Sequence, residues 1–316
     1  MIDPIPNEAH RVLEEGLFCY LAARTRWGPH LTPLVYAVHS SRLWVTTSRR
    51  SVKARVWRTD PSVGGLVRAG GRAIAFVGSA RTHDLLDPGT WLASARSAPA
   101  ITLAAGAFTR RNARFFAGYA VDAPRIPFAW SPPGRVFTEL RMDSAAVLAD
   151  GIVRRWGIRK REVHGWSAFR VPRDRVHPLE GVPNDVRDRV GDAGDAALAL
   201  DGPGGLWVVP ARWTIDRATL YAGVAEGALG LAGGGPTLPG AIVLDHASTW
   251  RAGAMEGAMV RGDAHVLVPR RLRSGRASAA RLLEGMDLEP TRSVLVSMTP
   301  SRIVWWRGWS AGTVVP

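Results

Sequence analysis

The chain of 316 residues is poor in cysteine and in long apolar runs. Its single cysteine, Cys19, excludes an internal disulfide and a cysteine-based zinc cluster, and it fits a reducing compartment. The longest nearly apolar stretch, residues 98–108, is far shorter than the roughly 20 residues that a membrane-spanning helix needs. Residues 1–8 have neither a basic head nor an apolar core, so no secretory signal is expected. These absences predict a cytoplasmic protein with no membrane partner.

Lysine is nearly absent as well. Lys53 and Lys160 are the only two lysines beside 39 arginines, and the formal net charge is +14. A strongly basic chain raises nucleic acid as a partner, because clustered cations release counterions from phosphates. The densest basic stretches, residues 154–161 and 270–276, lack the regularly interleaved aromatic side chains that stack on bases. The arginine excess accompanies many alanines and glycines, as a GC-rich coding sequence would give, so no nucleic-acid partner is expected.

The first half of the chain contains mainly short strands. Hydrophobic residues make up 46% of the chain, which is enough to bury a sizeable core over about two domains. The spacing of apolar residues and turn signals predicts a helix from Asn7 to about residue 23, strands at 31–38 and 43–47, a short helix at 51–59, a hairpin of strands 63–67 and 73–82, helical spacing over 87–120 with a break at Pro99, and a strand at 135–148.

The second half repeats this order after a charged, proline-containing connector. Its predicted elements are strands at 204–214, 219–224, 240–245 and 258–268, a helix at 274–285 and a closing strand at 303–308. Three pairs of segments match between the halves: 33–36 with 209–213, 43–45 with 220–222, and 77–80 with 260–264. Two similar antiparallel units follow, and we expect two small barrels packed against each other. The expected division is residues 1–150, a connector at 151–195, and residues 196–316.

One segment of the first half has the chemistry of an anion site. Thr46 and Thr47 end a predicted strand and offer hydroxyl donors. Ser51 and Lys53 follow in the first turn of a predicted helix, where free backbone N–H groups and the helix dipole favour an anion. A phosphate group fits this pattern. The eight histidines, by contrast, show no spacing typical of metal ligands, so no metal is expected.

Residues 14–67 resemble the FMN-binding split-barrel family, which includes pyridoxamine-5′-phosphate-oxidase-like proteins and deazaflavin (F420)-dependent oxidoreductases. The resemblance rests on three motifs in order: Gly-Pro-His-Leu-x-Pro at 28–33, Ser-x-Lys-Ala at 51–54 and Asp-Pro-x-Val at 60–63. It implies a mainly β, α+β fold in which two tandem split β-barrels form an intramolecular pseudo-dimer. It leaves open whether the chain is a monomeric pseudo-dimer or a homodimer.

The resemblance also implies a cofactor, FMN or F420, with haem as a less favoured alternative. In the family, the segment matching 46–53 holds the cofactor phosphate. Lys53 would pair with the phosphate and Arg55 would assist, while hydroxyl groups and the start of the helix would donate hydrogen bonds, and a strand backbone would face the cofactor ring. The implied hydrogen-bonding residues are Thr46, Thr47, Ser51 and Val52, and the implied ring-facing residues are Leu34, Val35 and Tyr36.

The second half departs from the family pattern at this segment. Residues 223–229 contain no lysine, and Glu226 would repel a phosphate. The second unit is therefore expected either to supply the other wall of a single cofactor site or to be a structural partner only. The aromatic and basic groups that are available for such a wall are Trp250, Arg251, Trp305, Trp306, Arg307 and Trp309.

The sequence thus predicts an oxidoreductase in which FMN or F420 transfers hydride to an unidentified small molecule. No side chain is assigned as an acid or base, because the cofactor carries the chemistry. Substrate is expected to enter beside Tyr36 and the tryptophan-rich C-terminal strand. Two alternatives stay open: a non-catalytic protein that holds flavin, F420 or haem, and a structural or nucleic-acid-associated protein acting through its arginine surface.

Overall fold

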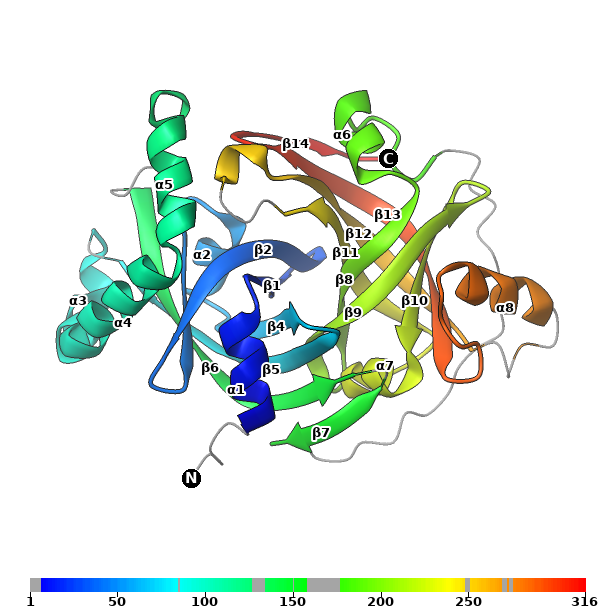
Figure 1. Cartoon of the computed structure of the whole chain (residues 1–316), viewed down its shortest axis with the longest axis horizontal. Helices are drawn as coiled ribbons and strands as arrows, with labels where there is room; N and C mark the ends of the chain where they lie inside the picture. The colour runs from blue at the N-terminus through cyan, green and yellow to red at the C-terminus, as the bar shows by residue number, and fades with distance from the viewer. Residues whose placement is uncertain are drawn as a thin grey trace.

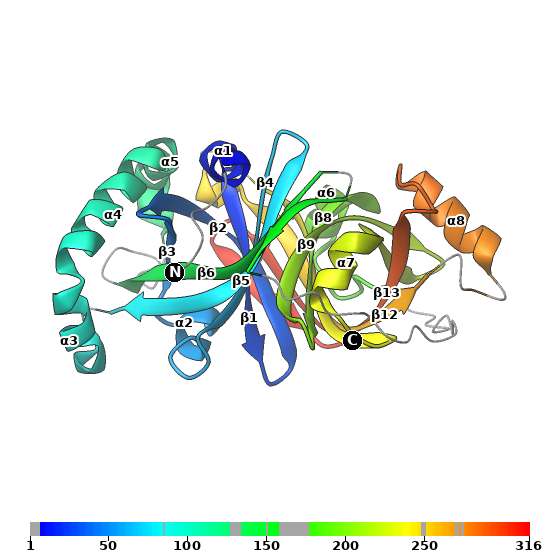
Figure 2. The ribbon, with the colours of Figure 1, turned by 90° about the horizontal axis from the view of Figure 1, so that it is seen from below.

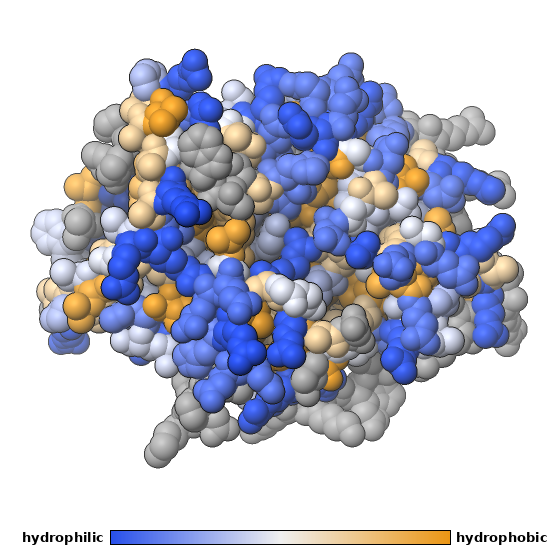
Figure 3. Space-filling model, viewed as in Figure 1, coloured by the Kyte–Doolittle hydropathy of each residue, from blue (hydrophilic) through white to orange (hydrophobic). Residues whose placement is uncertain are grey.

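The computed structural model describes residues 7–84, 86–126, 134–149, 151–157, 177–247, 251–268, 272 and 275–316. Two antiparallel seven-stranded sheets, one from each half of the chain, lie side by side (Figure 1). In the described part of the chain, no helix is both long and apolar enough to cross a membrane. On the face shown in Figure 3, hydrophobic residues are scattered among hydrophilic ones.

The first sheet closes on itself. Its strand order is β3-β2-β1-β4-β5-β6-β7, and an additional pairing of β3 with β6 makes a six-stranded barrel to which β7 is added outside. The strands are β1 (Phe18–Thr25), β2 (Gly28–His39), β3 (Arg42–Ser48), β4 (Ser62–Ala69), β5 (Arg72–His83), β6 (Arg135–Leu148) and β7 (Ile152–Trp156).

The second sheet has the same plan. Its order is β10-β9-β8-β11-β12-β13-β14, and β10 pairs with β13 to close the barrel. The fold of two tandem barrels, expected from the repeat and from the family resemblance, is confirmed. The strands are β8 (Ala193–Gly202), β9 (Gly205–Asp216), β10 (Thr219–Ala225), β11 (Thr237–His246), β12 (Glu256–Leu267), β13 (Ser293–Arg307) and β14 (Ser310–Val314).

Helices decorate the outer sides of the two barrels. Three consecutive helices inserted between β5 and β6 flank the first barrel, and α8 flanks the second barrel at the opposite end of the molecule (Figures 1 and 2). The short α2 follows β3, and α7 follows β10 in the same place. The helices are α1 (Asn7–Glu15), α2 (Val52–Val56), α3 (Pro88–Arg96), α4 (Ala98–Arg111), α5 (Ala113–Asp122), α6 (Asn184–Val190), α7 (Glu226–Ala232) and α8 (Arg276–Gly285), with 3₁₀ turns η1 (Ala123–Arg125) and η4 (Ala252–Ala254).

The two barrels can be aligned residue by residue at one hairpin. Ser40 and Ser41 form a two-residue turn between β2 and β3 with left-handed φ angles of 51° and 58°. Arg217 and Ala218 form the same turn between β9 and β10, with φ angles of 47° and 62°. Two-residue turns of this kind fix the register of the strands that they join. The turns therefore give a common origin from which residues of the two barrels correspond.

Counted from these turns, Tyr36 corresponds to Trp213. Tyr36 pairs with Val45 across the first hairpin, and Trp213 pairs with Ala222 at the same place in the second. Residues 33–36 then match residues 210–213, as the internal repeat predicts. The correspondence is used below to compare the two barrels position by position.

The predicted first helix is too long. Helix α1 ends at Glu15, and the residues from Phe18 form β1, which pairs with both β2 and β4. Five consecutive residues of β1 are buried because the strand has one face in the barrel and the other against the second barrel. Such a continuous apolar run has no alternation, so periodicity cannot distinguish it from a buried helix. Strand β8 and the first half of β13 were not predicted.

Burial divides the strands into two faces. Cys19, Leu21 and Tyr36 belong to the core of the first barrel, whereas Tyr20 and Leu31 belong to a core that is continuous with the second barrel. Cys19 is fully buried, as a small hydrophobe would be, although it lies on a strand rather than on the predicted helix. The barrels therefore share an apolar core, built from β1, β2, β4 and β5 on one side.

A β-bulge recurs in both barrels at a glycine. The register between β5 and β6 shifts at Gly78, and the register between β12 and β13 shifts at Gly262. A Cβ atom at Gly78 would stand 1.8 Å from the carbonyl oxygen of Arg141, and one at Gly262 would stand 1.8 Å from that of Thr299. Only glycine allows this approach of two backbones.

We expect Gly78→Ala to destabilise the protein by about 2 kcal/mol, because the added methyl group overlaps backbone that cannot move without breaking the ladder. The control is Gly106→Ala in α4, where nothing lies within 4 Å of the added atom and alanine is the better helix former. Urea unfolding followed by circular dichroism measures both. Equal stability of the two variants would contradict the structural role of the bulge.

Candidate functional site

The first barrel is split where β2 and β3 diverge. Strand β2 pairs with β3 only from Tyr36 onwards, and β3 continues along β6 instead. Residues 28–35 pair with β1 on one side, and no described strand pairs with their other edge. Leu34 and Val35 lie on this open edge, and Thr46 and Thr47 lie on the part of β3 that has turned away. The split thus brings the two predicted groups of site residues to its two sides.

Two of the three predicted hydroxyl groups, those of Ser51 and Thr47, meet at the start of α2. Ser51 is the N-cap of this helix, and its Oγ accepts a hydrogen bond of 3.1 Å from the N–H of Ala54. The Thr47 hydroxyl donates to the same oxygen over 3.1 Å, and Val52 is the first helical residue. Thr46 Oγ1 accepts a bond of 3.0 Å from Nε of Arg135. These contacts fix the direction of the short helix.

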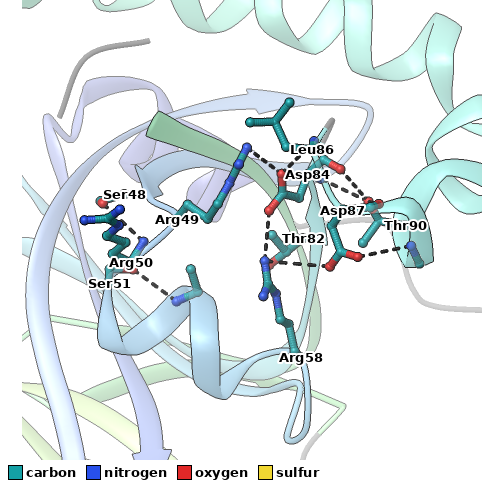
Figure 4. Close-up of polar contacts among 12 residues, drawn as sticks. Ser48, Arg49, Arg50, Ser51, Arg58, Thr82, Asp84, Leu86, Asp87 and Thr90 are labelled. Carbon is teal, nitrogen blue, oxygen red and sulfur yellow. Dashed lines mark hydrogen bonds and ion pairs between the residues drawn. The ribbon is translucent and has the colours of Figure 1, made fainter. Parts of the chain in front are cut away.

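A buried carboxylate holds the loop that leads into α2. Asp84 is 1% exposed, and its two oxygens accept bonds from Arg49 at 2.6 Å and from Arg58 at 2.8 Å (Figure 4). The N–H of Leu86 donates to the same carboxylate over 3.0 Å. Arg49 and Arg58 are therefore turned towards Asp84. Arg55 is exposed on the outside of α2.

Lys53 points inwards from α2 and is 2% exposed. Its Nζ donates a hydrogen bond to the Thr32 hydroxyl on β2, so the side chain bridges the split. No carboxylate pairs with Lys53 among the ion pairs of the described residues. Burial lowers the pKa of Lys53 to about 7, because removal from water penalises the charged form. An ammonium group in this position lacks the partner that buried charges normally have.

A second buried cation reaches the same strand from the other barrel. Arg261 of β12 is 5% exposed, and its Cδ lies 3.8 Å from the place where a side chain would begin at Gly28. Its Nη1 donates to Thr25 Oγ1 over 3.2 Å. Its Nε is buried and has no hydrogen-bond partner within the described residues. Burial lowers the pKa of Arg261, and the nearby Arg302 lowers it further.

His30 lies between these two cations along β2. Burial lowers the pKa of His30 to about 3, and the charges of Lys53 and Arg261 contribute to the decrease. The imidazole is therefore neutral. Gly28, His30 and Thr32 occupy alternate positions of one strand and so share a face. This face of β2 has a cation at each end and a neutral histidine in the middle.

The corresponding junction on the second barrel is apolar. A side chain at Gly205, which corresponds to Gly28, would begin 3.7 Å from Cγ1 of Val77, and Val77 corresponds to Arg261 because each precedes the bulge glycine of its barrel. Trp207 stands in place of His30, and Val209 in place of Thr32. Helix α7 begins with Glu226 and Gly227 where α2 begins with Val52 and Lys53, so it has no lysine at the matching position. Of the two matching junctions in the described residues, one is cationic and the other is not, so the first is the candidate anion site.

Tyr36 belongs to the core of the first barrel. Its side chain is 0% exposed, and its hydroxyl donates to the carbonyl oxygens of Leu13 at 2.6 Å and Gly16 at 3.1 Å. The Tyr36 side chain anchors α1 to the barrel, and the expectation that substrate enters beside it stays a prediction. A cavity of about 580 Å³ opens beside Val35. Its other lining residues are Leu17, Phe18, Arg111, Asn112, Arg114, Phe115 and Ala117.

The C-terminal aromatic residues divide between two roles. The Trp309 ring lies 5.0 Å from the Tyr119 ring of α5, edge to face, and Arg251 pairs with Asp122 of α5 at 2.6 Å. Trp305 and Trp306 pack against the core of the second barrel, and Arg307 pairs with Asp185. Trp250 lies outside the described residues. The contacts of Trp309 and Arg251 join the two halves at α5, whereas a contribution of this group to a cofactor wall stays a prediction.

Sequence reasoning did not single out His30, Arg135 or Arg261. His30 is part of the motif at residues 28–33, but the motif alone gives no reason to assign this histidine a role. Arg135 and Arg261 are two of 39 arginines, and only barrel closure and barrel packing show that Arg135 meets Thr46 and that Arg261 is buried.

No protein-family model and no curated protein matches the sequence. Solved structures that are similar include a pyridoxamine 5′-phosphate oxidase-related, FMN-binding protein from Nostoc punctiforme, at 18% identity and a TM-score of 0.34, with 47% of this chain and 86% of that chain covered. An FAD-binding protein from Mesorhizobium loti matches at 17% identity and a TM-score of 0.30, over 46% of this chain and 94% of that one. A conserved hypothetical protein from Mycobacterium tuberculosis matches at 21% identity and a TM-score of 0.33, over 52% and 94%.

Asp84→Asn should destabilise the protein by roughly 2–4 kcal/mol, because Arg49 and Arg58 both lose the negative charge that balances them, and the neutral side chain at position 84 stays buried between them. This loss of unfolding free energy is smaller than that expected for a fully buried ion pair, because Arg49 and Arg58 are partly solvated. Asp87→Asn is the control, since asparagine also caps α3 and the contact of Asp87 with Arg58 is long, at 3.7 Å. Chemical unfolding compares the two, and equal losses would show that Asp84 does not hold the loop.

Proposed function

We propose that the chain binds one phosphorylated flavin-type cofactor, FMN or F420, at the split of the first barrel. We further propose that it is an oxidoreductase acting on a small molecule. The observation that carries the proposal is the burial of Lys53 with no carboxylate partner among the described side chains. A cation in this state costs stability unless a ligand supplies the opposite charge.

A phosphate group suits the donors around Lys53. Lys53 would supply the positive charge, and the Ser51 and Thr47 hydroxyls stand at the start of the same helix. The Thr46 hydroxyl, which accepts a bond from Arg135, is proposed as a further donor. The N–H of Val52 belongs to the first helical turn, where backbone donors have no partner inside the helix. Because Asp84 engages Arg49 and Arg58, these two arginines would shape the loop rather than bind the ligand.

The open edge of β2 suits the ring of such a cofactor. Adjacent residues of a strand direct their backbone N–H and C=O groups to opposite edges, so one of Leu34 and Val35 presents these groups at the open edge, where no described strand uses them. The cavity beside Val35 is lined by Phe18 and Phe115 and could admit a small substrate next to the ring. When bound, the cofactor supplies the hydride chemistry. The chain's own residues would bind, orient and exclude water.

Lys53→Met should stabilise the ligand-free protein by roughly 1–4 kcal/mol at pH 7, because it replaces a desolvated amine with an apolar chain of similar length. An unfolded lysine titrates near pH 10.4, and burial lowers the pKa of Lys53 to about 7. Between these values the unfolded state holds the proton and the folded state does not, so the contribution of Lys53 to stability rises with pH. The advantage of the variant should therefore be largest at pH 7 and below and shrink towards pH 10.

Thermal unfolding at several pH values tests this expectation. Arg55→Met is the control, since it removes an exposed cation from the same helix and should change stability by less than about 0.5 kcal/mol. A loss of stability in Lys53→Met would mean that the lysine serves the fold rather than a ligand.

The same variant should lose the cofactor. We expect the purified protein, incubated with FMN, F420 or haem and freed of unbound ligand, to retain the absorption band of FMN or F420. Lys53→Met should lose that band, whereas Arg55→Met should keep it. Retention of none of the three by the unmodified protein would overturn the proposal, and retention of haem alone would favour the haem-binding alternative. Retention of FMN or F420 without turnover by any electron partner would identify a carrier rather than an enzyme.

A further inference from the structure

The cavity beside Val35 has an apolar, aromatic wall. Val35 of β2 pairs with Phe18 of β1, and the Phe18 ring lies edge to face against the Phe115 ring of α5, with centroids 6.5 Å apart. All three side chains line the cavity, whose volume of about 580 Å³ is typical of a small-molecule site. A surface that includes two aromatic rings suits a ligand with a flat apolar body.

The helical wall of the cavity is fixed in place. Arg111, the last residue of α4, donates from Nη2 to the carbonyl oxygens of Leu13 at 2.8 Å and Gly16 at 2.6 Å. The next residue, Asn112, donates from Nδ2 to the carbonyl oxygen of Tyr36 over 3.1 Å. The end of α4 is thus tied both to β2 and to the end of α1 (Figure 1). A wall that is held in this way loses little conformational freedom when a ligand binds.

The charged residues of the lining are both basic. Arg111 and Arg114 line the cavity, and no acidic residue does so within the described part of the chain. Neither arginine takes part in an ion pair between described residues. The hydrogen bonds of Arg111 go to carbonyl oxygens and to the Tyr36 hydroxyl, which are neutral groups. An anionic group is therefore the partner that this part of the lining favours.

The second barrel shows that the fold does not dictate this lining. Counted from the two-residue turns, Arg212 corresponds to Val35, and its strand partner Asp195 corresponds to Phe18. Arg212 and Asp195 form an ion pair, with Nε 3.4 Å from Oδ1, and both line a cavity of about 570 Å³. The same backbone positions accept an ion pair in one barrel and an apolar pair in the other. The apolar pair is therefore a property of the first cavity rather than a requirement of the barrel.

We infer that the substrate of the proposed function has a flat apolar body and one anionic group, as an aromatic carboxylate does. Phe18 and Phe115 would contact the body, and Arg111 and Arg114 would bind the anion. The assignment rests on the proposed function, because only a bound cofactor makes a ligand of this cavity a substrate. Binding of the ligand itself requires the cavity alone, so the two claims are tested separately.

Three probes separate the apolar body from the charge: 2-naphthoate, its neutral amide 2-naphthamide, and acetate, an anion without the body. Calorimetric titration measures their affinities for the cofactor-free protein. Leu17 lines the cavity and is 55% exposed, so Leu17→Glu adds a negative charge there, and Leu17→Gln is its neutral control. Arg114→Gln removes a cation from the lining, and Arg96→Gln, exposed on α3 and outside the lining, is its control. Melting temperatures of all variants are recorded alongside.

We expect 2-naphthoate to bind the unmodified protein at least about 10-fold more tightly than 2-naphthamide, because hydrogen bonds between charged groups are the stronger ones. Acetate should bind more weakly than either. Arg114→Gln should weaken 2-naphthoate about 3- to 5-fold, as expected for a partly solvated ion pair, and Leu17→Glu should weaken it about 5- to 10-fold. Leu17→Gln, Arg96→Gln and Lys53→Met should stay within about twofold of the unmodified protein.

The protein loaded with FMN or F420 tests the role as a substrate. Because the cavity adjoins Val35, 2-naphthoate should shift the absorption band of the bound cofactor. An unshifted band would show that the ligand does not lie beside the ring and is not a substrate.

Other outcomes would overturn the ligand class. Equal affinities for 2-naphthoate and 2-naphthamide would remove the anion from the inference. Equal losses in Arg114→Gln and Arg96→Gln would indicate attraction by the net charge alone, and a loss confined to Lys53→Met would place the probe at the split. Binding that depends on Arg114 in a protein that retains no cofactor would overturn the proposed function and still support the ligand class, so the two failures are distinguishable.

Discussion

The positive charge of Lys53 must be balanced inside the protein, and no carboxylate of the described residues balances it. The lysine enters from the first turn of α2, crosses the split between two diverging strands and ends at the Thr32 hydroxyl. The split itself follows from barrel closure, because β3 leaves β2 in order to pair with β6. Closure of the barrel thus produces both the open edge of β2 and the buried place in which Lys53 lies. In the proposed function, this charge is what a bound phosphate would balance.

The two barrels keep the same construction and differ in the chemistry of one junction. Both have the two-residue turn, the glycine bulge and the closing strand pair, so the backbone plan does not depend on what each barrel binds. At the junction, His30 of the first barrel occupies the position of Trp207 in the second, and Arg261 of the second barrel occupies the position of Val77 in the first. The apolar version suits a dry interface, and the cationic version costs stability. An internal pair of barrels can divide these tasks, because each half is free to change without its copy changing too.

Much of the fold could be predicted from local signals, and little of the packing could. The hairpin at Gly70 and Gly71, the break at Pro99 and the repeat of strands depend on turn residues that act within a few positions. Strand β1 was mistaken for helix because its burial on both faces removes the alternation that marks a strand. At the site, Lys53 stood out by its place after Ser51 and by the scarcity of lysine. Arg261 did not, since its burial depends on how the second barrel meets β2.

The choice of lysine at position 53 is consistent with the surroundings of the split. Arginine keeps its charge under almost all conditions and needs several acceptors in a plane, and the arginines near α2 find them at Asp84. Lysine is a compact charge on a flexible chain, and burial alone brings its pKa near neutrality. In the proposed function, a phosphate bound at the split would favour the protonated form of this amine. A lysine whose pKa lies near neutrality costs less to bury without a ligand than an arginine, which keeps its charge.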